Sequence, residues 1–229
     1  MPTERQRQEY LQALGLDIWI PRRKFDQSEL DVTEVTITVD SSVPDWELLR
    51  STVAACTGCL LHENRTQTVF GVGDLNADWM IVGEAPGAEE DRCGEPFVDR
   101  AGKLLDEMLR AVGLDRSTTF ITNILKCRLP NNRDPAGNET EACRGYLERQ
   151  VELVNPRLIL AVGRIAAQSL LHSDSSVGQL RGCLHFLNDG QIPLVVTYHP
   201  TYLLRNPSQK RKVWEDLCLA KKVVQESLT

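Results

Sequence analysis

The sequence contains no long hydrophobic run. None of its apolar stretches approaches the roughly 20 residues that a membrane-spanning helix needs. Residues 1–7 are polar and lack the apolar core of a secretory signal. Internal repeats and low-complexity tracts are also absent. We therefore expect a cytosolic protein with no membrane partner.

Positive charge is missing from one segment near the N-terminus. Between Lys24 and Arg50 there are seven acidic residues and no Lys or Arg, in a chain whose formal net charge is −6. The remainder of the chain is therefore close to neutral, so the net charge does not exclude a nucleic-acid partner. The acidic segment has few large apolar residues to bury, and we interpret residues 1–45 as an N-terminal extension with an acidic linker.

The remaining length and composition predict one sizeable domain. The chain has 229 residues, of which 41% are hydrophobic, enough for a single α/β domain over residues 46–229. Seven cysteines in a cytosolic protein indicate metal ligands and free thiols more than disulfides.

Helical and strand patterns alternate along this domain. After a short helix at residues 5–15, the expected helices lie at residues 46–55, 102–112, 139–153, 163–171 and 212–226. The expected strands lie at residues 79–82, 120–124, 157–162 and 194–197. This order predicts an α/β three-layer sandwich with a central, mostly parallel four-stranded sheet flanked by helices.

The unusual loops all follow predicted strands. They are residues 83–87, 123–133, 163–164 and 198–200. Ligands of such folds bind outside the carboxyl ends of the strands. We therefore expect these loops to form one site.

Residues 83–102 form a glycine-rich loop in which the backbone can approach a ligand closely. Phe97 lies between turn residues, where its ring can stack on a planar base or, alternatively, fill the core. Glu84 and Glu90 are acids near a strand end and can orient or activate water.

Two later loops supply polar side chains. Asn123 can pair its amide with a base edge, because an amide offers both a donor and an acceptor; capping a turn is the alternative. His199 can donate to negative charge that develops on a ligand.

The segment after His199 has features of a DNA contact. Leu203 and Leu204 can form an apolar wedge that enters a base stack, and Arg205 can hold a phosphate, as can Arg128 in the preceding loop. A solvated basic helix start is the alternative interpretation.

Four cysteines have the spacing of a metal centre. Cys56 and Cys59 form a CxxC pair, whereas Cys127 and Cys143 come from separate segments, which fits a zinc ribbon poorly. Four thiolates from scattered segments suit a 4Fe–4S cluster, with structural zinc as the alternative. The other three cysteines have no partner spacing and are interpreted as plain thiols.

These motifs together resemble a known family. Gly83-Glu84-Ala85-Pro86-Gly87, Gly94-Glu95-Pro96-Phe97-Val98, Thr122-Asn123 with Cys127, and His199-Pro200 with Leu203-Leu204-Arg205 are similar to the family 4 uracil-DNA glycosylases, which are iron–sulfur enzymes. The resemblance extends from about Cys56 to the C-terminus. It implies hydrolysis of the N-glycosidic bond of deoxyuridine in single- and double-stranded DNA, which leaves free uracil and an abasic site. It also implies a monomer associated with the bacterial nucleoid.

The resemblance assigns roles to individual residues. Phe97 stacks on the flipped uracil, Asn123 reads its Watson–Crick edge, and His199 stabilises charge at the uracil O2. Glu84 lies beside the reacting centre, and Glu90 is a second candidate for positioning water. Ala85 and Gly87 line the pocket with backbone groups. Glu84, Glu90, Asn123 and His199 are the candidate catalytic residues.

Two departures from the family pattern are visible. Asp99 stands where the family usually has Gly, and its carboxylate can repel DNA phosphates or crowd the pocket. The segment between Asn123 and Cys143 lacks the basic His-containing insertion of the superfamily branch that traps uracil covalently. The competing hypotheses are a non-catalytic iron–sulfur DNA-binding module of replication or repair machinery, and a different hydrolase with zinc at the cysteines.

Overall fold

The structure is a computed structural model that describes residues 45–187 and 191–227. The predicted helix at residues 5–15 and the acidic segment up to residue 44 lie outside the described residues. Within the described ranges, no helix combines the length and hydropathy that crossing a membrane requires.

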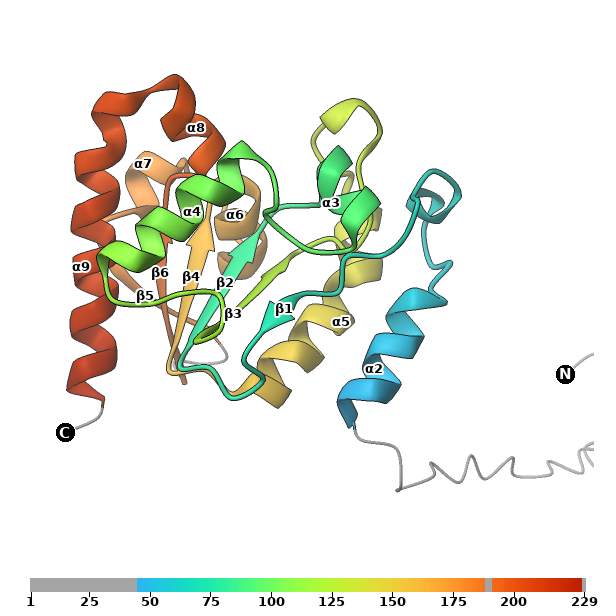
Figure 1. The fold of residues 1–229 in the computed structure, drawn as a ribbon, viewed down its shortest axis with the longest axis horizontal. Coiled ribbons are helices and arrows are strands. Elements are labelled where there is room, and N and C mark those ends of the chain that lie inside the picture. Colours follow the sequence, from blue (N-terminus) through green and yellow to red (C-terminus); the bar gives the residue numbers. More distant parts are fainter. Residues whose placement is uncertain (1–44, 188–190, 228–229) are drawn as a thin grey trace, which may run out of the picture. The chain divides into compact units, whose positions relative to one another are not determined.

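One six-stranded sheet forms the centre of the domain, in the order β1-β3-β2-β4-β6-β5 (Figure 1). The four inner strands run parallel to one another, and β1 and β5 pair with them antiparallel at the two edges. The strands are β1 (Val72–Gly73), β2 (Trp79–Gly83), β3 (Thr119–Asn123), β4 (Leu158–Val162), β5 (Leu184–Leu187) and β6 (Ile192–Thr197).

Helices cover both faces of the sheet, as the near-continuous apolar character of the inner strands requires. The helices are α2 (Asp45–Ala54), α3 (Ala88–Cys93), α4 (Arg100–Ala111), α5 (Gly137–Val154), α6 (Arg164–Leu171), α7 (Val177–Leu180), α8 (Pro200–Arg205) and α9 (Lys210–Glu226). Short 3-10 turns lie at η1 (Leu60–Glu63), η2 (Pro130–Asn132) and η3 (Pro207–Gln209).

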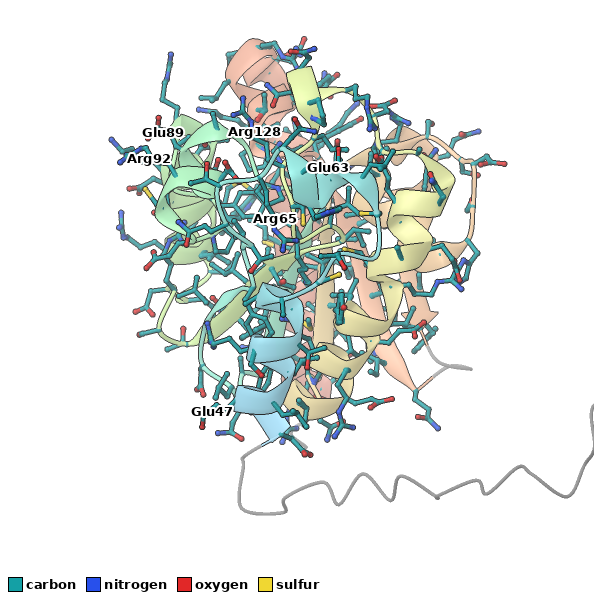
Figure 2. All side chains as sticks on the ribbon, turned by 90° about the vertical axis from the view of Figure 1, so that its right-hand side faces the viewer. Glu47, Glu63, Arg65, Glu89, Arg92 and Arg128 are labelled. Atoms are coloured by element: carbon teal, nitrogen blue, oxygen red, sulfur yellow. The ribbon has the colours of Figure 1, made fainter. Side chains whose placement is uncertain are left out.

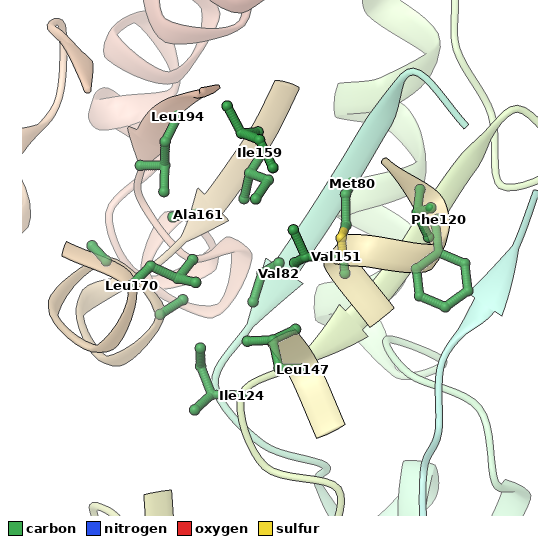
Figure 3. Packing of buried hydrophobic residues seen from close by; sticks show 14 of the residues in the cluster. Met80, Val82, Phe120, Ile124, Leu147, Val151, Ile159, Ala161, Leu170 and Leu194 are labelled. Carbon is green, nitrogen blue, oxygen red and sulfur yellow. The ribbon is translucent and has the colours of Figure 1, made fainter. Parts of the chain in front are cut away.

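Alternate residues of each inner strand enter two separate cores. Met80 and Val82 of β2 pack with α2, α5, α6 and α7 on one face (Figure 3). Trp79 and Ile81 of the same strand pack with α4, α8 and α9 on the other face. The α/β three-layer architecture predicted from the sequence is therefore confirmed.

The sheet is larger than the four strands that were predicted. The two additional strands are both edges: β1 has only two residues, and β5 alternates exposed and half-buried positions. Neither presents the continuous apolar run by which a buried strand is recognised. The four predicted strands are the four parallel ones, and their carboxyl ends meet at one end of the sheet.

The chain reverses its direction of travel across the sheet beside β2. The connection from β2 leads to β3 on one side, and the next connection leads to β4 on the other side of β2. Such a switch point leaves a crevice between the loops that follow β2 and β4.

Candidate active site

A cavity of about 800 Å³ opens at the carboxyl ends of the parallel strands. Its walls come from the loops after β2, β3, β4 and β6, together with the starts of α4, α7 and α8. The predicted pocket residues that line it are Glu84, Ala85, Gly87, Glu90, Phe97, Asn123 and His199. The structure thus brings together in one cavity all seven residues that were predicted to bind uracil or to be catalytic.

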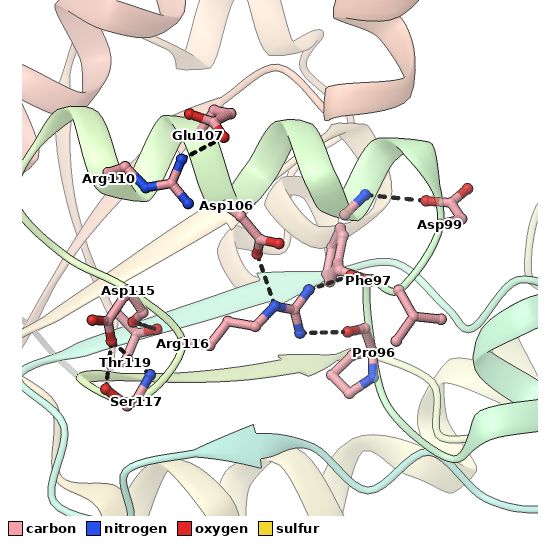
Figure 4. A network of polar contacts seen from close by, with 12 residues as sticks. Pro96, Phe97, Asp99, Asp106, Glu107, Arg110, Asp115, Arg116, Ser117 and Thr119 are labelled. Carbon is pink, nitrogen blue, oxygen red and sulfur yellow. Dashed lines mark hydrogen bonds and ion pairs between the residues drawn. The ribbon is translucent and has the colours of Figure 1, made fainter.

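Phe97 is held in an unusual backbone conformation at this cavity. Its φ is 55°, in the left-handed region that non-glycine residues seldom adopt. Arg116 fixes this turn, because its guanidinium donates to the carbonyl oxygens of Pro96 and Phe97 while its Nε donates to Asp106 at 2.7 Å (Figure 4). The ring is 7% exposed and contributes both to the cavity wall and to the core beneath it. The ring therefore helps to fill the core, as one of the two interpretations has it, and it also faces the cavity, where stacking on a base stays a prediction.

Gly102 provides the space for this turn. A Cβ at Gly102 would lie 1.8 Å from the carbonyl oxygen of Phe97. The first turn of α4 can approach the Phe97 backbone only because this position has no side chain.

Asn123 is the last residue of β3 and is 2% exposed. It lies opposite Gly83 of β2, where an added Cβ would come within 2.4 Å of Asn123 Oδ1 and 2.5 Å of Phe97 Cζ. The absence of a side chain at Gly83 lets the amide and the ring lie next to each other above the strand end. Among the described residues, no protein group hydrogen-bonds the Asn123 amide.

His199 begins α8 and presents a defined tautomer to the cavity. Its Nδ1 accepts a hydrogen bond from the backbone N–H of Thr201 at 3.2 Å, so the proton of a neutral ring is on Nε2. Burial lowers the pKa of His199 to about 4, opposed by the nearby carboxylate of Asp99 and reinforced by Arg205. The ring is therefore neutral at pH 7 and offers Nε2–H as a donor.

Glu84 lies at the switch point, directly after β2. Burial raises the pKa of its carboxyl; the charge of Asp134 acts in the same direction, and Arg164 opposes both. Asp134 and Arg164 also line the cavity and form an ion pair of 2.6 Å across it, from the loop after β3 to the start of α6.

Glu90 lies in α3 and is 6% exposed. Its Oε1 accepts hydrogen bonds from the backbone N–H groups of Val98 at 3.0 Å and Asp99 at 3.3 Å, which ties the helix to the Phe97 turn. Its Oε2 points to Gly87, where an added Cβ would lie 2.6 Å away. One carboxylate oxygen is thus committed to the backbone.

Asp99, the departure from the family pattern, is the N-cap of α4. Its Oδ1 accepts from the backbone N–H groups of Ala101 at 2.7 Å and Gly102 at 3.1 Å (Figure 4). The side chain also lines the cavity, so its charge is available to a ligand.

The predicted DNA contacts differ in their exposure. Leu203 is 1% exposed and packs in the core between α4 and α9, which corrects its predicted role as part of a wedge. Leu204 is 37% exposed and can reach a partner, as can Arg205 at the rim of the cavity. Helical geometry explains the difference, since adjacent residues of α8 point in different directions. Arg128 is half-buried, and its Nε has no hydrogen-bond partner among the described residues.

The four predicted metal ligands converge beside this cavity. Cys127 and Cys143 are buried among Leu61, Leu125 and Leu129, with Cys59 packed against them. Burial raises the pKa of the Cys127 thiol, and the charges of Cys59 and Cys56 act in the same direction, so these sulfurs lie near one another. Arg65, which the sequence did not single out, donates to Cys127 Sγ at 3.1 Å.

The spacing of these sulfurs indicates whether they can bind a single metal ion or a cluster. In the described parts of the chain, no three Cys, His, Asp or Glu side chains lie close enough to bind one metal ion. In a 4Fe–4S cluster each of four thiolates binds a different iron, which requires wider separation. Four thiols from three segments within an apolar shell, with an arginine hydrogen-bonded to one sulfur, fit such a cluster.

A buried lysine connects the cysteines to the cavity. Lys126 is 1% exposed, and its Nζ donates to Thr122 Oγ1, the Asn123 carbonyl oxygen and Gln150 Oε1 at 2.7–2.8 Å. Burial lowers its pKa to about 7. Lys126 and Arg116 were not predicted, because nothing in the linear pattern distinguishes a buried polar anchor from a surface cation.

A pair of tyrosines in the cavity wall was also outside the predicted set. Tyr198 and Tyr202 stack with ring centroids 4.9 Å apart and line one wall. They flank the His-Pro motif that was predicted, and proximity to that motif was the available signal.

Comparison with known proteins identifies related sequences. Residues 70–218 match the family model of the Uracil DNA glycosylase superfamily. A protein of Thermotoga maritima named "Type-4 uracil-DNA glycosylase" is 42% identical over 184 residues, which cover 79% of this chain and 95% of that protein. Proteins of the same name are 41% identical in Pyrobaculum aerophilum, over 76% of this chain and 92% of that protein, and in Archaeoglobus fulgidus, over 72% and 85%.

Proposed function

The chain belongs to the uracil DNA glycosylase superfamily, and from this premise we propose how its cavity releases uracil from DNA. It is a DNA-repair glycosylase that removes uracil, as the resemblance predicted. The non-catalytic alternative is not favoured, because relatives matched over most of their length carry the name of the enzyme. The reaction hydrolyses the N-glycosidic bond of deoxyuridine and leaves free uracil and an abasic site.

The convergence of Phe97, Asn123 and His199 on one cavity is the observation that carries this proposal. The flipped uracil stacks on the Phe97 ring, whose position Arg116 fixes. No described protein group hydrogen-bonds the Asn123 amide. It can therefore donate to an oxygen on the Watson–Crick edge of uracil and accept from the adjacent N–H. Both groups are held before the base arrives, so little ordering remains when it binds.

His199 supplies the electrostatic part of the mechanism. As the glycosidic bond breaks, its electron pair moves to the uracil N1 and negative charge spreads to O2. The neutral imidazole donates Nε2–H to O2, because Nδ1 is already an acceptor for the Thr201 N–H. A preorganised donor in a buried site stabilises such charge better than water does.

Glu84 is our candidate for orienting the attacking water. It lies directly after β2 and beside the ion pair of Asp134 and Arg164, and its carboxylate oxygens have no hydrogen-bond partner among the described groups. The water adds to C1′ of the deoxyribose and releases one proton, and the departing uracil anion is protonated in turn. Glu90 is the weaker candidate, since its Oε1 holds the Val98 and Asp99 backbone.

Of the proposed DNA contacts, Arg205 lines the cavity, Leu204 is its neighbour in α8, and Arg128 lies in the loop after β3. Flipping the base out of a duplex costs a few kcal/mol, which contacts to the DNA must offset. We assign these contacts to Leu204, which enters the base stack as a wedge, and to Arg128 and Arg205, which bind phosphates. A single strand has no paired partner to displace, so we propose that both single- and double-stranded DNA are substrates.

The cofactor is proposed to be one 4Fe–4S cluster held by Cys56, Cys59, Cys127 and Cys143. When bound, it joins three segments of the chain and takes no part in the hydrolysis. An anaerobic preparation should contain iron and inorganic sulfide and absorb visible light. A colourless preparation that contains only zinc would show that the four cysteines hold zinc and not an iron–sulfur cluster.

The domain boundaries and the assembly state are also proposals. Residues 46–229 form the catalytic domain, which acts as a monomer on DNA of the bacterial nucleoid, and residues 1–45 are an extension that uracil release does not need. A chain beginning at residue 46 should keep the full rate and sediment as a monomer. A dimer, or loss of activity on truncation, would contradict this.

The function is tested with labelled oligonucleotides that contain one uracil, in single- and double-stranded form. Release of the base leaves an alkali-labile site, so alkali should cleave both substrates after incubation. Asn123→Ala should lower kcat/KM by at least about 100-fold, whereas Asn138→Ala, at an exposed position of α5, should not. Intact strands with the unmodified protein would overturn the proposed activity, and an active Asn123→Ala protein would overturn the assigned pocket.

A further inference from the structure

A second cavity, of about 560 Å³, lies outside the active site between α2, η1 and the segment at residues 65–70. Arg50, His62 and Arg65 line it, together with Thr66 and Thr68, and its lining includes no Asp or Glu. Cationic and hydroxyl donors without an acid are the groups that bind a phosphate.

The arginines of this cavity differ from most others in the described chain. Arginines elsewhere form ion pairs with a carboxylate within 4 Å. Five of those in the described residues form none: Arg50, Arg65, Arg100, Arg128 and Arg205. Arg205 lines the active site and Arg100 directly follows Asp99, which also lines it. Two of these five arginines therefore lie in or next to the active-site cavity, and two others line the second cavity.

The guanidinium groups of the second cavity are positioned in advance. Arg65 donates to Cys127 Sγ at 3.1 Å and to the Ala54 carbonyl oxygen at 3.0 Å. Arg50 is exposed, and its guanidinium lies 4.5 Å from the centre of the Phe70 ring. The buried acid Asp91 accepts from the Thr66 backbone N–H with both oxygens and does not line the cavity.

Two connections place this cavity within reach of DNA bound at the active site. Helix α3 contributes Glu90 to the active site and is followed by Gly94, which lines the second cavity. This helix has six residues, about 9 Å at 1.5 Å per residue. On the other side, Arg65 contacts Cys127, the neighbour of Arg128, and Figure 2 shows Arg65 and Arg128 on the same side of the molecule.

We propose that Arg50 and Arg65 form a second phosphate site, which binds the DNA backbone a few nucleotides from the flipped uracil. The site rests on the proposed function, since its ligand is the strand that the active site holds. It contacts phosphates alone and is independent of sequence. Its role is to anchor the strand while the base leaves the stack.

The salt dependence of binding tests this site. Binding of a 20-nucleotide uracil-free duplex is measured at several salt concentrations for the wild type, Arg50→Gln and a control, Arg110→Gln, whose exposed arginine pairs with Glu107 on α4. The slope of log K against log salt is negative, and loss of one phosphate contact lowers its magnitude by about 0.9. Arg50→Gln should show this decrease and weaker binding, and Arg110→Gln should keep the wild-type slope. An unchanged slope for Arg50→Gln overturns the proposal.

Substrate length provides a second, independent readout. Uracil oligonucleotides are shortened one nucleotide at a time from each end, and KM is compared between wild type and Arg50→Gln. On one side, shortening should raise the KM of the wild type in a single step that the variant lacks. Absence of a step, or the same step in both proteins, counts against the site.

These outcomes are distinguishable from failure of the proposed function. The maximal single-turnover rate of uracil release should be the same in Arg50→Gln and wild type, because Arg50 does not line the active site. A wild-type protein that releases no uracil would reject the function itself. A variant with a lower maximal rate would show that Arg50 acts on the chemistry and not as an anchor.

Discussion

The ring of Phe97 stacks against the imidazole of His199, with centroids 5.6 Å apart and planes inclined by 30°. The two residues are far apart in sequence and belong to loops after different strands. Their contact places the stacking surface for the base beside the donor for its developing charge. Substrate binding and electrostatic stabilisation are therefore built as one unit.

The neutral state of His199 predicts a pH profile. Because burial lowers its pKa to about 4 in the free protein, the acidic limb of kcat/KM that belongs to this residue should be centred near pH 4. An ordinary histidine would place it near pH 6.5. The rate of uracil release is measured from pH 4 to 8. A limb at pH 6.5 would contradict the assigned neutral donor.

The same residue makes stability depend on pH. Between about pH 6.5 and pH 4 the unfolded state binds a proton at His199 and the folded state does not, so stability falls as pH decreases through this range. The melting temperature of His199→Gln should fall less over this range than that of the wild type. His172→Gln, at an exposed position, serves as the control.

The carboxylate of Asp99 has two roles, capping α4 and carrying a negative charge at the cavity, and substitutions can separate them. Asp99→Asn keeps an N-cap side chain, so its stability should stay within a few tenths of a kcal/mol, whereas Asp99→Ala should lose about 1 kcal/mol. Both changes remove the carboxylate that raises the pKa of His199, so the acidic limb should move to lower pH. Both should also bind DNA more tightly. Unfolding curves and pH–rate profiles measure these effects, and weaker DNA binding by Asp99→Asn would contradict the expectation.

Gly83→Ala should disable the pocket without unfolding the domain. The new methyl group would meet Asn123 Oδ1 and the Phe97 ring at about 2.5 Å or less, so both side chains must move. Misplacement of this size can cost about 100-fold in kcat/KM. Gly145→Ala is the matched control, because a Cβ there meets nothing within 4 Å on helix α5. It should keep full activity and gain about 0.5–1 kcal/mol of stability.

The cysteines should contribute to folding more than to chemistry. Cys143→Ala should lose visible absorbance and destabilise the domain by about 4 kcal/mol or more, in the range expected for loss of a metal centre. The rate per folded molecule should fall less than it does in Asn123→Ala. Cys218→Ala removes an exposed thiol and should leave absorbance and melting unchanged. Full absorbance in Cys143→Ala would exclude this residue as a ligand.

Residues in regular patterns were predictable, and residues fixed by contacts were not. The four inner strands and the loops after them follow from apolar runs and from the convergence of parallel strand ends, so Asn123 and His199 could be placed at one site. The edge strands β1 and β5 were not predicted, because neither contains a continuous run of buried apolar residues. Leu203 was misassigned because a helix of six residues is too short to show which side chain faces the core.

The sequence by itself determined the α/β class, the family and the residue types at the pocket, because these depend on local pattern and motif. Only the tertiary structure decided the state of those residues. The turn of Phe97 depends on Arg116 and Gly102, the tautomer of His199 depends on the Thr201 amide, and the carboxylate of Asp99 serves α4 as its cap. Hydrogen bonds, burial and close packing set these properties, and they exist only after distant segments have come together.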